Sequence, residues 1–463
     1  MQNVFDEVAS LDERCYKEFA LSEDILMEHA ADGMADFIKT NFSACKSILI
    51  ACGGGNNGAD GMALARLLHK TYDVKVYLTK EPSSPMAKLQ YERIANLGVP
   101  LTKTLEPCDI IIDAIFGTGL SRPLDETTAS YIKELNNLDA IKIACDIPSG
   151  LYVNGECDTA TFRADYTLTM GALKRSMFSD AAKDFTGEIT VLDLGIDRTL
   201  YEKTSKTKLL DFTDMRLPLR AKQNSHKGSY GHLAVVSGEK LGASVLCASA
   251  ALRFGCALVT LLSNENPQIP TELMLSHQLP HNTTAIALGM GLGVEFSQNE
   301  LNQFLENDLP LLLDADIFYH PLITSLLKRK NIILTPHPKE FVRLLHVSGV
   351  ADIDVEELQR DRFKYAALFA NKFPDTVLVL KGANVIIVKG HEIYINPHGT
   401  NILAKGGSGD VLGGLIASLL AQCISPLEAA ITGSLAHTKL AKNYQGANFS
   451  LTPNDLIEGI AAL

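Results

Sequence analysis

Short apolar runs that alternate with helical patterns restrict the fold of this 463-residue chain more than any other feature. Runs rich in isoleucine and valine are typical of buried strands, because a parallel sheet is covered on both faces. In the first half they occupy residues 47–52, 74–78, 110–116, 141–147, 166–170 and 189–194. Helical patterns, such as 60–69 and 86–97, separate them, and an amphipathic helix at about 23–39, with Ser22 as its N-cap, precedes them. This alternation predicts a parallel sheet with helices on both faces.

The second half repeats the pattern after a polar stretch. Charged and polar residues dominate between 199 and 224, and we expect the linker near 200–212. Strands are predicted at 233–237, 258–263, 285–288, 311–314, 332–335, 377–381 and 385–388, and helices at 243–254, 355–369, 411–421 and 426–443. Because domains of about 100–200 residues are usual, the length also favours two domains. We therefore predict an α/β protein of two three-layer α/β/α domains, residues 1–205 and 206–463.

Composition excludes some classes of function. The net charge of −12 argues against non-specific nucleic-acid binding, which requires clustered lysine and arginine, but helix N-termini still allow a phosphate-bearing ligand. The sequence has no apolar run near the roughly 18 residues of a membrane span, and its start does not resemble a signal peptide. Its nine cysteines lack CxxC spacing, which favours reduced thiols over a zinc site. We expect a cytoplasmic protein that binds small molecules rather than nucleic acid or membrane.

A glycine-rich segment, ACGGGNNGADG at residues 51–61, follows the first predicted strand. Successive glycines let the backbone approach a ligand closely, and the N–H groups at the start of the next helix form an anion site suited to a pyrophosphate. Asn56, Asn57 and Asp60 add polar side chains. A tight turn without a ligand is the alternative interpretation. The spacing is not GxGxxG, so the usual dehydrogenase fingerprint is not indicated.

Two more loops follow strands in the first half. DAIFGTGLSRP, at residues 113–123, begins with Asp113, and DIPSG, at residues 146–150, begins with Asp146. Ligands in open α/β sheets bind beyond the carboxyl ends of the strands, so the three loops should converge there. The alternative is that each aspartate caps a neighbouring turn.

In this order and spacing, GGGNNGADG, DAIFGTG and DIPSG closely resemble the NAD(P)H-hydrate epimerase family. The segment ILMEHAADGMA, at residues 25–35, is similar to that family's N-terminal helix. The resemblance covers about residues 5–200 and implies a Rossmann-like domain. It implies proton transfer by Asp146 and a potassium ion held by Asn57, Asp113 and Ser149. It further implies that the hydrated cofactor contacts Asn56, Asn57, Gly58, Ala59, Asp60, Gly117, Thr118, Gly119, Leu120, Ser121, Arg122, Pro123 and Asp146.

A second glycine-rich segment, AKGGSGDVLGG at residues 404–414, precedes an apolar helical pattern. Its N–H groups and the helix N-terminus suit a phosphoryl group during transfer. Asp410, at the start of the helix, is placed to accept a proton from an attacking hydroxyl. The alternative is an aspartate N-cap after a glycine turn, which explains Asp410 but not the surrounding glycines.

GGSGD before such a helix strongly resembles the ribokinase-like superfamily. Together with HKGSYG (226–231), TPHPKE (335–340) and KGA (381–383), it looks like the ADP-dependent NAD(P)H-hydrate dehydratase family. This resemblance covers about residues 210–463. It implies that Asp410 is the catalytic base, and that ADP is bound with Mg²⁺. It implies hydrate contacts at Ala243, Gly291 or Gly293, His337 and Asp410, and nucleotide contacts at Lys381, Gly382, Ala383, Asn384, Val385 and Gly409.

Both domains, in this order, resemble the bifunctional NAD(P)H-hydrate repair family. The resemblance implies epimerisation of the R and S hydrates, and dehydration of the S hydrate to NAD(P)H with ADP converted to AMP and phosphate. Val385 stands where the family's nucleotide loop usually has threonine, and residues 396–400, NPHGT, depart from the commoner NPTGN. We expect a homo-oligomer. A small-molecule kinase fused to a Rossmann-like partner and a non-catalytic cofactor-binding module are the alternatives.

Overall fold

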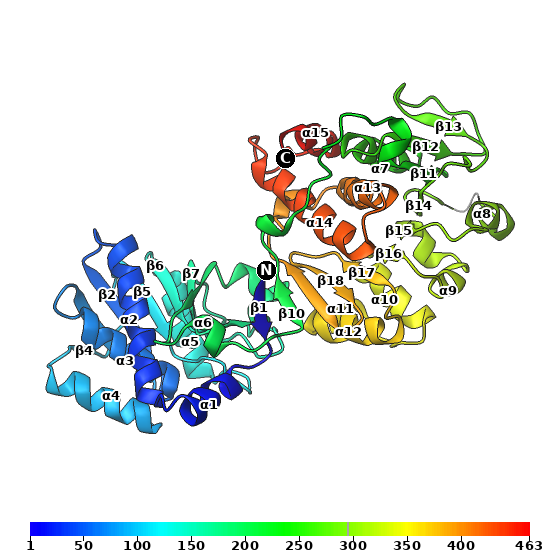
Figure 1. Ribbon diagram of the computed structural model, residues 1–463. Helices are drawn as coiled ribbons and strands as arrows, with labels where there is room; N and C mark the ends of the chain where they lie inside the picture. The colour runs from blue at the N-terminus through cyan, green and yellow to red at the C-terminus, as the bar shows by residue number, and fades with distance from the viewer. Residues whose placement is uncertain (294–295) are drawn as a thin grey trace. The chain divides into compact units, whose positions relative to one another are not determined.

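The computed structural model describes residues 1–293 and 296–463 (Figure 1). The chain divides into two compact units, Asn3–Ser205 and Lys206–Leu463, and Met1–Gln2 groups with the second. Each unit combines helices with a largely parallel sheet, so the predicted α/β class is confirmed. None of the described helices is long and apolar enough to cross a membrane.

The sheet of the first unit has the strand order β4-β3-β2-β5-β6-β7-β9, and all of these neighbours pair in parallel. The carboxyl ends of β2, β5 and β6 therefore lie at one edge. Strand β1 pairs in parallel with β8, with Val4 opposite Leu173. The strands are β1 Gln2–Phe5, β2 Ser47–Cys52, β3 Asp73–Leu78, β4 Leu101–Thr102, β5 Ile110–Ala114, β6 Ile141–Cys145, β7 Tyr166–Met170, β8 Leu173–Lys174 and β9 Glu188–Leu192.

Helices cover both faces of this sheet because successive strand residues point to opposite sides. Ile48 and Ile50 of β2 belong to a buried cluster that also contains residues of α2, α3 and α4. Leu49 and Ala51 belong to a second cluster with Ile132 of α5. The helices of the unit are α1 Ala9–Glu18, α2 Glu23–Asn41, α3 Asn56–Leu68, α4 Pro85–Asn96, α5 Glu126–Asn137 and α6 Arg198–Tyr201, with 3₁₀ turns at Arg175–Phe178 and Ala181–Asp184.

In the first unit one predicted helix start agrees with the structure, whereas a second helix and two strands begin or end at other residues than predicted. Ser22 is the N-cap of α2, as predicted, and its Oγ accepts a hydrogen bond from the amide of Ile25. Helix α3 begins at Asn56 rather than at residue 60, because Gly55 takes the extended N-cap conformation. Strand β6 ends at Cys145 rather than at 147, because the left-handed backbone of Asp146, with φ of 71°, turns the chain out of the sheet. Strand β5 likewise ends at Ala114 rather than at 116.

The sheet of the second unit has the order β13-β12-β11-β14-β15-β16-β17-β18-β19-β10. Its strands pair in parallel except β17-β18 and β18-β19, which are antiparallel hairpin neighbours. The strands are β10 Thr207–Leu209, β11 His232–Val236, β12 Leu258–Leu262, β13 Met274–Ser276, β14 Ala285–Leu288, β15 Leu311–Leu313, β16 Ile332–Leu334, β17 Val377–Leu380, β18 Val385–Lys389 and β19 Glu392–Asn396.

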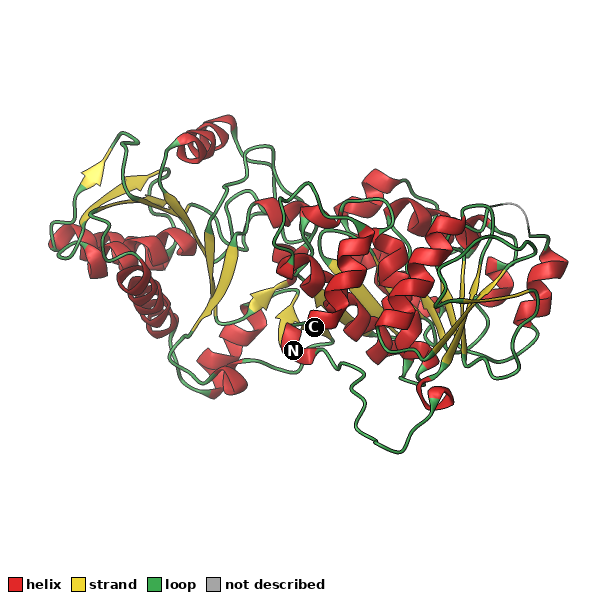
Figure 2. Ribbon diagram, turned by 90° about the horizontal axis from the view of Figure 1, so that it is seen from above, coloured by secondary structure: helices red, strands yellow, loops and turns green. Residues whose placement is uncertain are grey.

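Helices again lie on both sides of the strands in this unit, in agreement with the predicted three layers (Figure 2). They are α7 Leu241–Arg253, α8 Gln298–Leu305, α9 Ile323–Leu326, α10 Pro338–Val347, α11 Val355–Arg360, α12 Arg362–Lys372, α13 Ser408–Ala421, α14 Pro426–Asn443 and α15 Pro453–Gly459. The predicted helix at 355–369 is two helices. Asp361 leaves the helical region between α11 and α12, and its side chain accepts a hydrogen bond from the amide of Lys364 at the start of α12.

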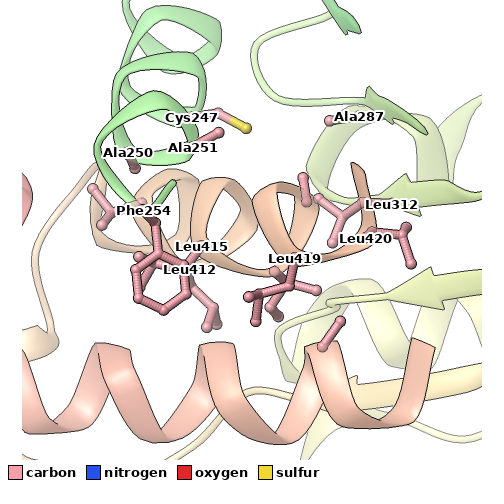
Figure 3. Close-up of a cluster of buried hydrophobic side chains, with 14 of the residues drawn as sticks. Cys247, Ala250, Ala251, Phe254, Ala287, Leu312, Leu412, Leu415, Leu419 and Leu420 are labelled. Carbon is pink, nitrogen blue, oxygen red and sulfur yellow. The ribbon is translucent and has the colours of Figure 1, made fainter. Parts of the chain in front are cut away.

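The largest apolar cluster of the second unit surrounds α13. Figure 3 shows α13 packed against α7, where Leu412 and Leu415 lie near Phe254. Strand residues Ala287 and Leu312 complete this side of the core. A helix that is apolar on nearly all sides has to be buried, and α13 is covered by α7, α14 and the sheet. This burial fixes the N-terminus of α13, where Asp410 lies.

Candidate active sites

A cavity of about 480 Å³ lies in the first unit, beyond the carboxyl ends of its central strands. Residues of the three predicted loops line it, together with side chains from α1 and α2. Met27, Ile115 and Phe116 contribute apolar side chains to the lining, and Asp12, Glu23, Asp60 and Asp146 contribute carboxyl groups. An apolar cleft with a few convergent polar groups is the usual form of a small-molecule site.

Residues of the glycine-rich segment fall into two groups, those that line the cavity and those that are buried in helix packing. Gly54, Gly55, Asn56, Asn57 and Asp60 line the cavity. The predicted contacts Gly58 and Ala59 are buried in α3. A Cβ at Gly58 would overlap the carbonyl oxygen of Gly53, so close packing of helix on loop already requires this glycine.

The loop at 117–123 divides in the same manner. Gly117, Thr118 and Gly119 line the cavity. Leu120 is buried, and the remaining predicted contacts lie outside the cavity lining as exposed residues: Ser121, Arg122 and Pro123.

Asp146 lies in the cavity and is bound through one carboxylate oxygen. Its Oδ1 accepts hydrogen bonds from the amide of Met170 at 3.1 Å and from Thr169 Oγ1 at 3.3 Å, and it forms an ion pair with Lys174 Nζ. Its Oδ2 lies 3.4 Å from the position of a Cβ at Gly117. This second oxygen therefore points toward the glycine loop.

Two other carboxyl groups of the cavity hold their protons more tightly than usual. Burial, followed by the negative charge of Asp146, raises the pKa of Asp60 well above its ordinary value. Burial also raises the pKa of Asp12, although the hydroxyl of Tyr201 donates to its Oδ1 at 2.8 Å. The cavity thus contains two carboxyl groups with raised pKa values in addition to Asp146.

Asp113 and Ser149 form a buried pair beneath the cavity. Asp113 is fully buried, and its carboxylate accepts from the Ser149 amide and hydroxyl, each at 2.7 Å, and from the Ile115 amide at 3.2 Å. Burial raises the pKa of Asp113 to about 6. Among the described residues no cation forms an ion pair with it. The predicted third ligand, Asn57, has its Oδ1 3.2 Å from the Cβ position of Gly117.

In the second unit, Asp410 lies at the N-terminus of α13 within a charged cluster. Lys381 Nζ is 2.8 Å from Asp314 Oδ1 and 3.9 Å from Glu340 Oε2. Gly409 adjoins this cluster, since a Cβ there would lie 3.5 Å from Lys381 Nζ. Burial, then the charge of Asp314, raises the pKa of Asp410 to about 7, and burial raises the pKa of Glu340 to about 7. The predicted base therefore lies beside a lysine and a glycine-rich helix start.

His337 begins α10 as its N-cap. Its Nδ1 accepts hydrogen bonds from the amides of Lys339 and Glu340, at 3.1 and 3.3 Å. Its Nε2 is 3.2 Å from Glu340 Oε1. With Nδ1 as an acceptor, the proton of the neutral ring is on Nε2. His337 therefore has a structural role as the N-cap of α10, and it lies beside the charged cluster.

The predicted nucleotide loop is the turn between β17 and β18. Gly382 and Ala383 are exposed, whereas Asn384 and Val385 are buried, and Val385 belongs to the apolar core. Any contact by Val385 would therefore be through its backbone. Arg362, which is 3% exposed, donates to the carbonyls of Leu380, Lys381 and Asn384 at 2.8–3.2 Å and fixes this turn.

The predicted hydrate contacts Ala243 and Gly291 lie together. A Cβ at Gly291, where φ is +65°, would lie 3.1 Å from the Cβ of Ala243. Gly293 donates its amide to Asp316 Oδ2 at 2.9 Å, which connects this loop to the segment after β15.

Both units also match known families in sequence. Residues 23–176 match the family described as YjeF-related protein N-terminus, and residues 233–461 match the family described as NAD(P)H-hydrate dehydratase. The bifunctional NAD(P)H-hydrate repair enzyme Nnr of Helicobacter pylori is 42% identical, and the match covers all of both chains. The chain belongs to the bifunctional NAD(P)H-hydrate repair enzyme family. The Coxiella burnetii Nnr is 34% identical over 97% of each chain.

A solved structure is also similar to about half of this chain. It is an ADP/ATP-dependent NAD(P)H-hydrate dehydratase from Bacillus subtilis, co-crystallised with ATP/Mg²⁺. The two are 31% identical over 52% of this chain and 92% of that chain, with a TM-score of 0.45.

Sequence reasoning missed several residues at the two sites of this repair-family chain. Asp12, Lys174 and Tyr201 line the first cavity, yet none belongs to a glycine-rich motif. Lys174 had one available signal, its place at the end of the segment GALK that directly follows the predicted buried strand at 166–170. Arg362 had none, because an arginine in a helical pattern is ordinarily a solvent-exposed residue.

Proposed function

We propose that the first unit epimerises the R and S hydrates of NAD(P)H and that the second dehydrates the S hydrate to NAD(P)H, converting ADP to AMP and phosphate. One shared observation supports this most directly. In each unit a motif aspartate, Asp146 or Asp410, lies beside a glycine-rich helix start at the carboxyl ends of parallel strands. Such an edge suits a phosphate-bearing ligand, and the aspartate suits proton transfer.

Epimerisation requires the configuration at the hydroxyl-bearing ring carbon to be lost and restored. In our proposal Asp146 takes the hydroxyl proton, the oxygen forms a carbonyl, and the electron pair of the breaking ring C–N bond goes to nitrogen. A protonated carboxyl group, Asp60, gives the nitrogen its proton. Closure on the other face of the carbonyl reverses every transfer. Paired acid and base roles are commonly divided between two carboxyl groups in different environments.

We further propose that Asn57, Asp113 and Ser149 hold a potassium ion. A buried carboxylate whose partners are neutral N–H and O–H donors is compatible with a nearby cation. Potassium would supply positive charge beneath the cavity and stabilise the anionic parts of the bound cofactor.

For dehydration, hydroxide is a poor leaving group and has to be converted to phosphate. In our proposal Asp410 accepts the ring hydroxyl proton as that oxygen bonds to the terminal phosphorus of ADP, and AMP leaves. The phosphate then leaves with the ring C–O electron pair, and loss of a proton from the adjacent carbon restores the double bond. Lys381 and the N–H groups before α13 bind the transferring group.

Magnesium would accompany the nucleotide at this site, in line with the Bacillus relative that was co-crystallised with ATP/Mg²⁺. A hard cation prefers carboxylate and phosphate oxygens, and Glu340, a buried carboxyl group 3.9 Å from Lys381, could supply one ligand. Magnesium supplies charge that screens the nucleotide phosphates.

The test uses separated R and S hydrates of NADH with ADP or ATP. Wild-type protein should restore the NADH absorbance from either epimer. Asp410→Asn should abolish recovery from both, and Asp146→Asn should abolish recovery from R beyond the uncatalysed rate but keep it from S. Unchanged turnover in both variants would disprove the assignment.

We propose a cytoplasmic homo-oligomer, supported by the reduced cysteine pattern for the compartment and testable for assembly by light scattering of purified protein. The acidic net charge supports the expectation that nucleic acid is not a partner.

A further inference from the structure

Lys174 is the most deeply buried cation of the first unit's cavity, with 1% of its surface exposed. Its Nζ contacts Asp146 Oδ1, Thr169 Oγ1 at 2.8 Å and the Met170 carbonyl at 3.0 Å. An ammonium group removed from water is strongly destabilising unless it is paired and hydrogen-bonded. These three contacts pair and hydrogen-bond the ammonium group. One is with Asp146, and the other two are with Thr169 and Met170, which also contact Asp146.

The backbone around Lys174 holds the side chain in this direction. Gly171, with φ of 67°, turns the chain after β7, and a Cβ there would lie 2.6 Å from the Tyr201 ring. Strand β8 then pairs in parallel with β1, where Lys174 is opposite Phe5. The lysine is therefore positioned by a sheet partner as well as by its own hydrogen bonds.

The ion pair distinguishes one carboxylate from its neighbours. Asp12, Glu23, Asp60 and Asp146 all line the cavity. Among the described residues, Asp146 alone of these four forms an ion pair with a basic side chain. Asp12 is hydrogen-bonded by Tyr201, and Glu23 by the Asn56 side-chain amide at 2.6 Å. A single cation is thus paired with one of the four carboxyl groups, Asp146.

The two oxygens of Asp146 have different surroundings. All three donors, Lys174 Nζ, the Met170 amide and Thr169 Oγ1, contact Oδ1. No hydrogen bond joins Oδ2 to the described residues, and this oxygen faces Gly117, which lines the cavity. Oδ1 is therefore occupied by protein donors, and Oδ2 remains available to a ligand.

We propose that Lys174 is a positioning residue for epimerisation, which holds Asp146 as an anion through Oδ1 so that Oδ2 accepts the substrate proton. This inference rests on the proposed function of the first unit. Oδ2 takes the hydroxyl proton as the ring C–N bond breaks, and returns it on closure, so Lys174 itself neither gains nor loses a proton.

The first test measures epimerisation by Lys174→Met in the full chain across a range of pH. Removing the cation should lower kcat at neutral pH by at least about tenfold, with a smaller change in KM. The pH at which the rate rises should move upward, because Asp146 then lacks the ammonium group that pairs with its carboxylate. Asp12, Glu23, Asp60, Tyr16 and Tyr201 are the other titratable groups of the cavity. Lys174→Arg should restore part of the rate and the original pH profile.

Lys142→Met is the matched control. Lys142 is on the same strand as Cys145, β6, but at its opposite end, where Nζ donates to the Leu138 carbonyl at 2.7 Å. It should keep the wild-type pH profile. Dehydration of the S hydrate by each variant serves as an internal reference within the same chain, because its residues lie in the second unit.

A double variant separates the inference from the function on which it rests. If Lys174 acts through Asp146, Asp146→Asn with Lys174→Met should be no slower than Asp146→Asn alone. A normal rate in Asp146→Asn would overturn the proposed function. An inactive Asp146→Asn with wild-type kcat and pH profile in Lys174→Met would overturn the role of Lys174 alone. If Lys174→Met does not fold, Lys174→Gln replaces it, and an unshifted pH profile in that variant would equally overturn the role of Lys174.

Discussion

At the scale of single residues, each site contains one carboxylate in direct contact with a lysine and another carboxyl group whose pKa is raised by burial. Asp314 is 2.8 Å from Lys381, whereas Asp410 belongs to the same cluster without that contact. Burial and the charge of Asp314 raise the pKa of Asp410 to about 7. A residue that must accept a proton near neutral pH is best suited by such a value. The first unit shows a similar division, with Asp146 paired to Lys174 and with the pKa of Asp60 raised by burial.

The raised pKa gives a directional prediction for dehydration. The base has to be ionised to accept the hydroxyl proton, so kcat/KM for the S hydrate should rise as pH increases through the Asp410 pKa of about 7. Glu340, with a pKa also raised to about 7, titrates over the same range. Asp410→Asn should lose at least about a hundredfold in kcat at every pH. A wild-type rate that falls with increasing pH over this range would contradict the assignment.

The potassium assignment predicts a stability difference that does not depend on turnover. Potassium chloride should raise the thermal unfolding temperature of the wild-type first unit above that in choline chloride at equal ionic strength. Asp113→Asn removes the charged ligand, so the two salts should then give the same temperature. Calorimetry of the full chain without substrate measures this, and an equal potassium effect in Asp113→Asn would exclude this site.

At the scale of elements, close helix contacts determine where glycine is required. Gly414 of α13 faces α7, where a Cβ would overlap the Cys247 carbonyl and lie 2.8 Å from the Ala250 Cβ. A Cβ at neighbouring Gly413 would meet the flexible end of Leu312 at 3.3 Å. Glycine pattern alone does not separate these cases, because both residues belong to the same GG pair.

This contrast predicts opposite effects of the same substitution. Alanine is favoured over glycine by at most about 1 kcal/mol in a helix interior, whereas overpacking costs about 1–3 kcal/mol. Gly414→Ala should therefore lower the free energy of unfolding, and Gly413→Ala should be neutral or slightly stabilising. Urea denaturation of the two variants measures the difference. Equal stabilities would show that α7 and α13 are not packed in this way.

Arg362 provides a second prediction at this scale, because α12 holds the β17–β18 turn through it. Arg362→Met removes the donors to the Lys381 and Asn384 carbonyls, each contact worth about 1.5–3 kcal/mol for a charged donor. The KM for ADP should rise by about tenfold or more, with epimerisation unchanged. Arg360→Met, on the exposed side of α11, is the control and should keep the wild-type KM.

At the scale of the whole molecule, each unit has its own sheet, core and site. The residues that line the first cavity all belong to Asn3–Ser205, and the Asp410 cluster belongs to Lys206–Leu463. The S hydrate is the product of one proposed site and the substrate of the other, and each site is built from residues of one unit.

This separation predicts complementation between chains. A mixture of Asp146→Asn and Asp410→Asn proteins should recover NADH from both epimers, although either variant alone leaves the R hydrate unrepaired. The recovery rate should depend on the concentration of each chain. Failure of the mixture to consume the R hydrate would mean that the two sites must act within one molecule.

The sequence by itself determined the α/β class and the two aspartates with their glycine-rich loops, because these depend on local periodicity and on backbone freedom within a few residues. The tertiary structure decided that Gly58 serves packing, that Val385 faces the core and that helix 355–369 is divided at Asp361. It also brought Lys174 to Asp146 and Arg362 to the turn between β17 and β18. Such pairings arise from burial and strand order across distant segments, which local sequence patterns do not encode.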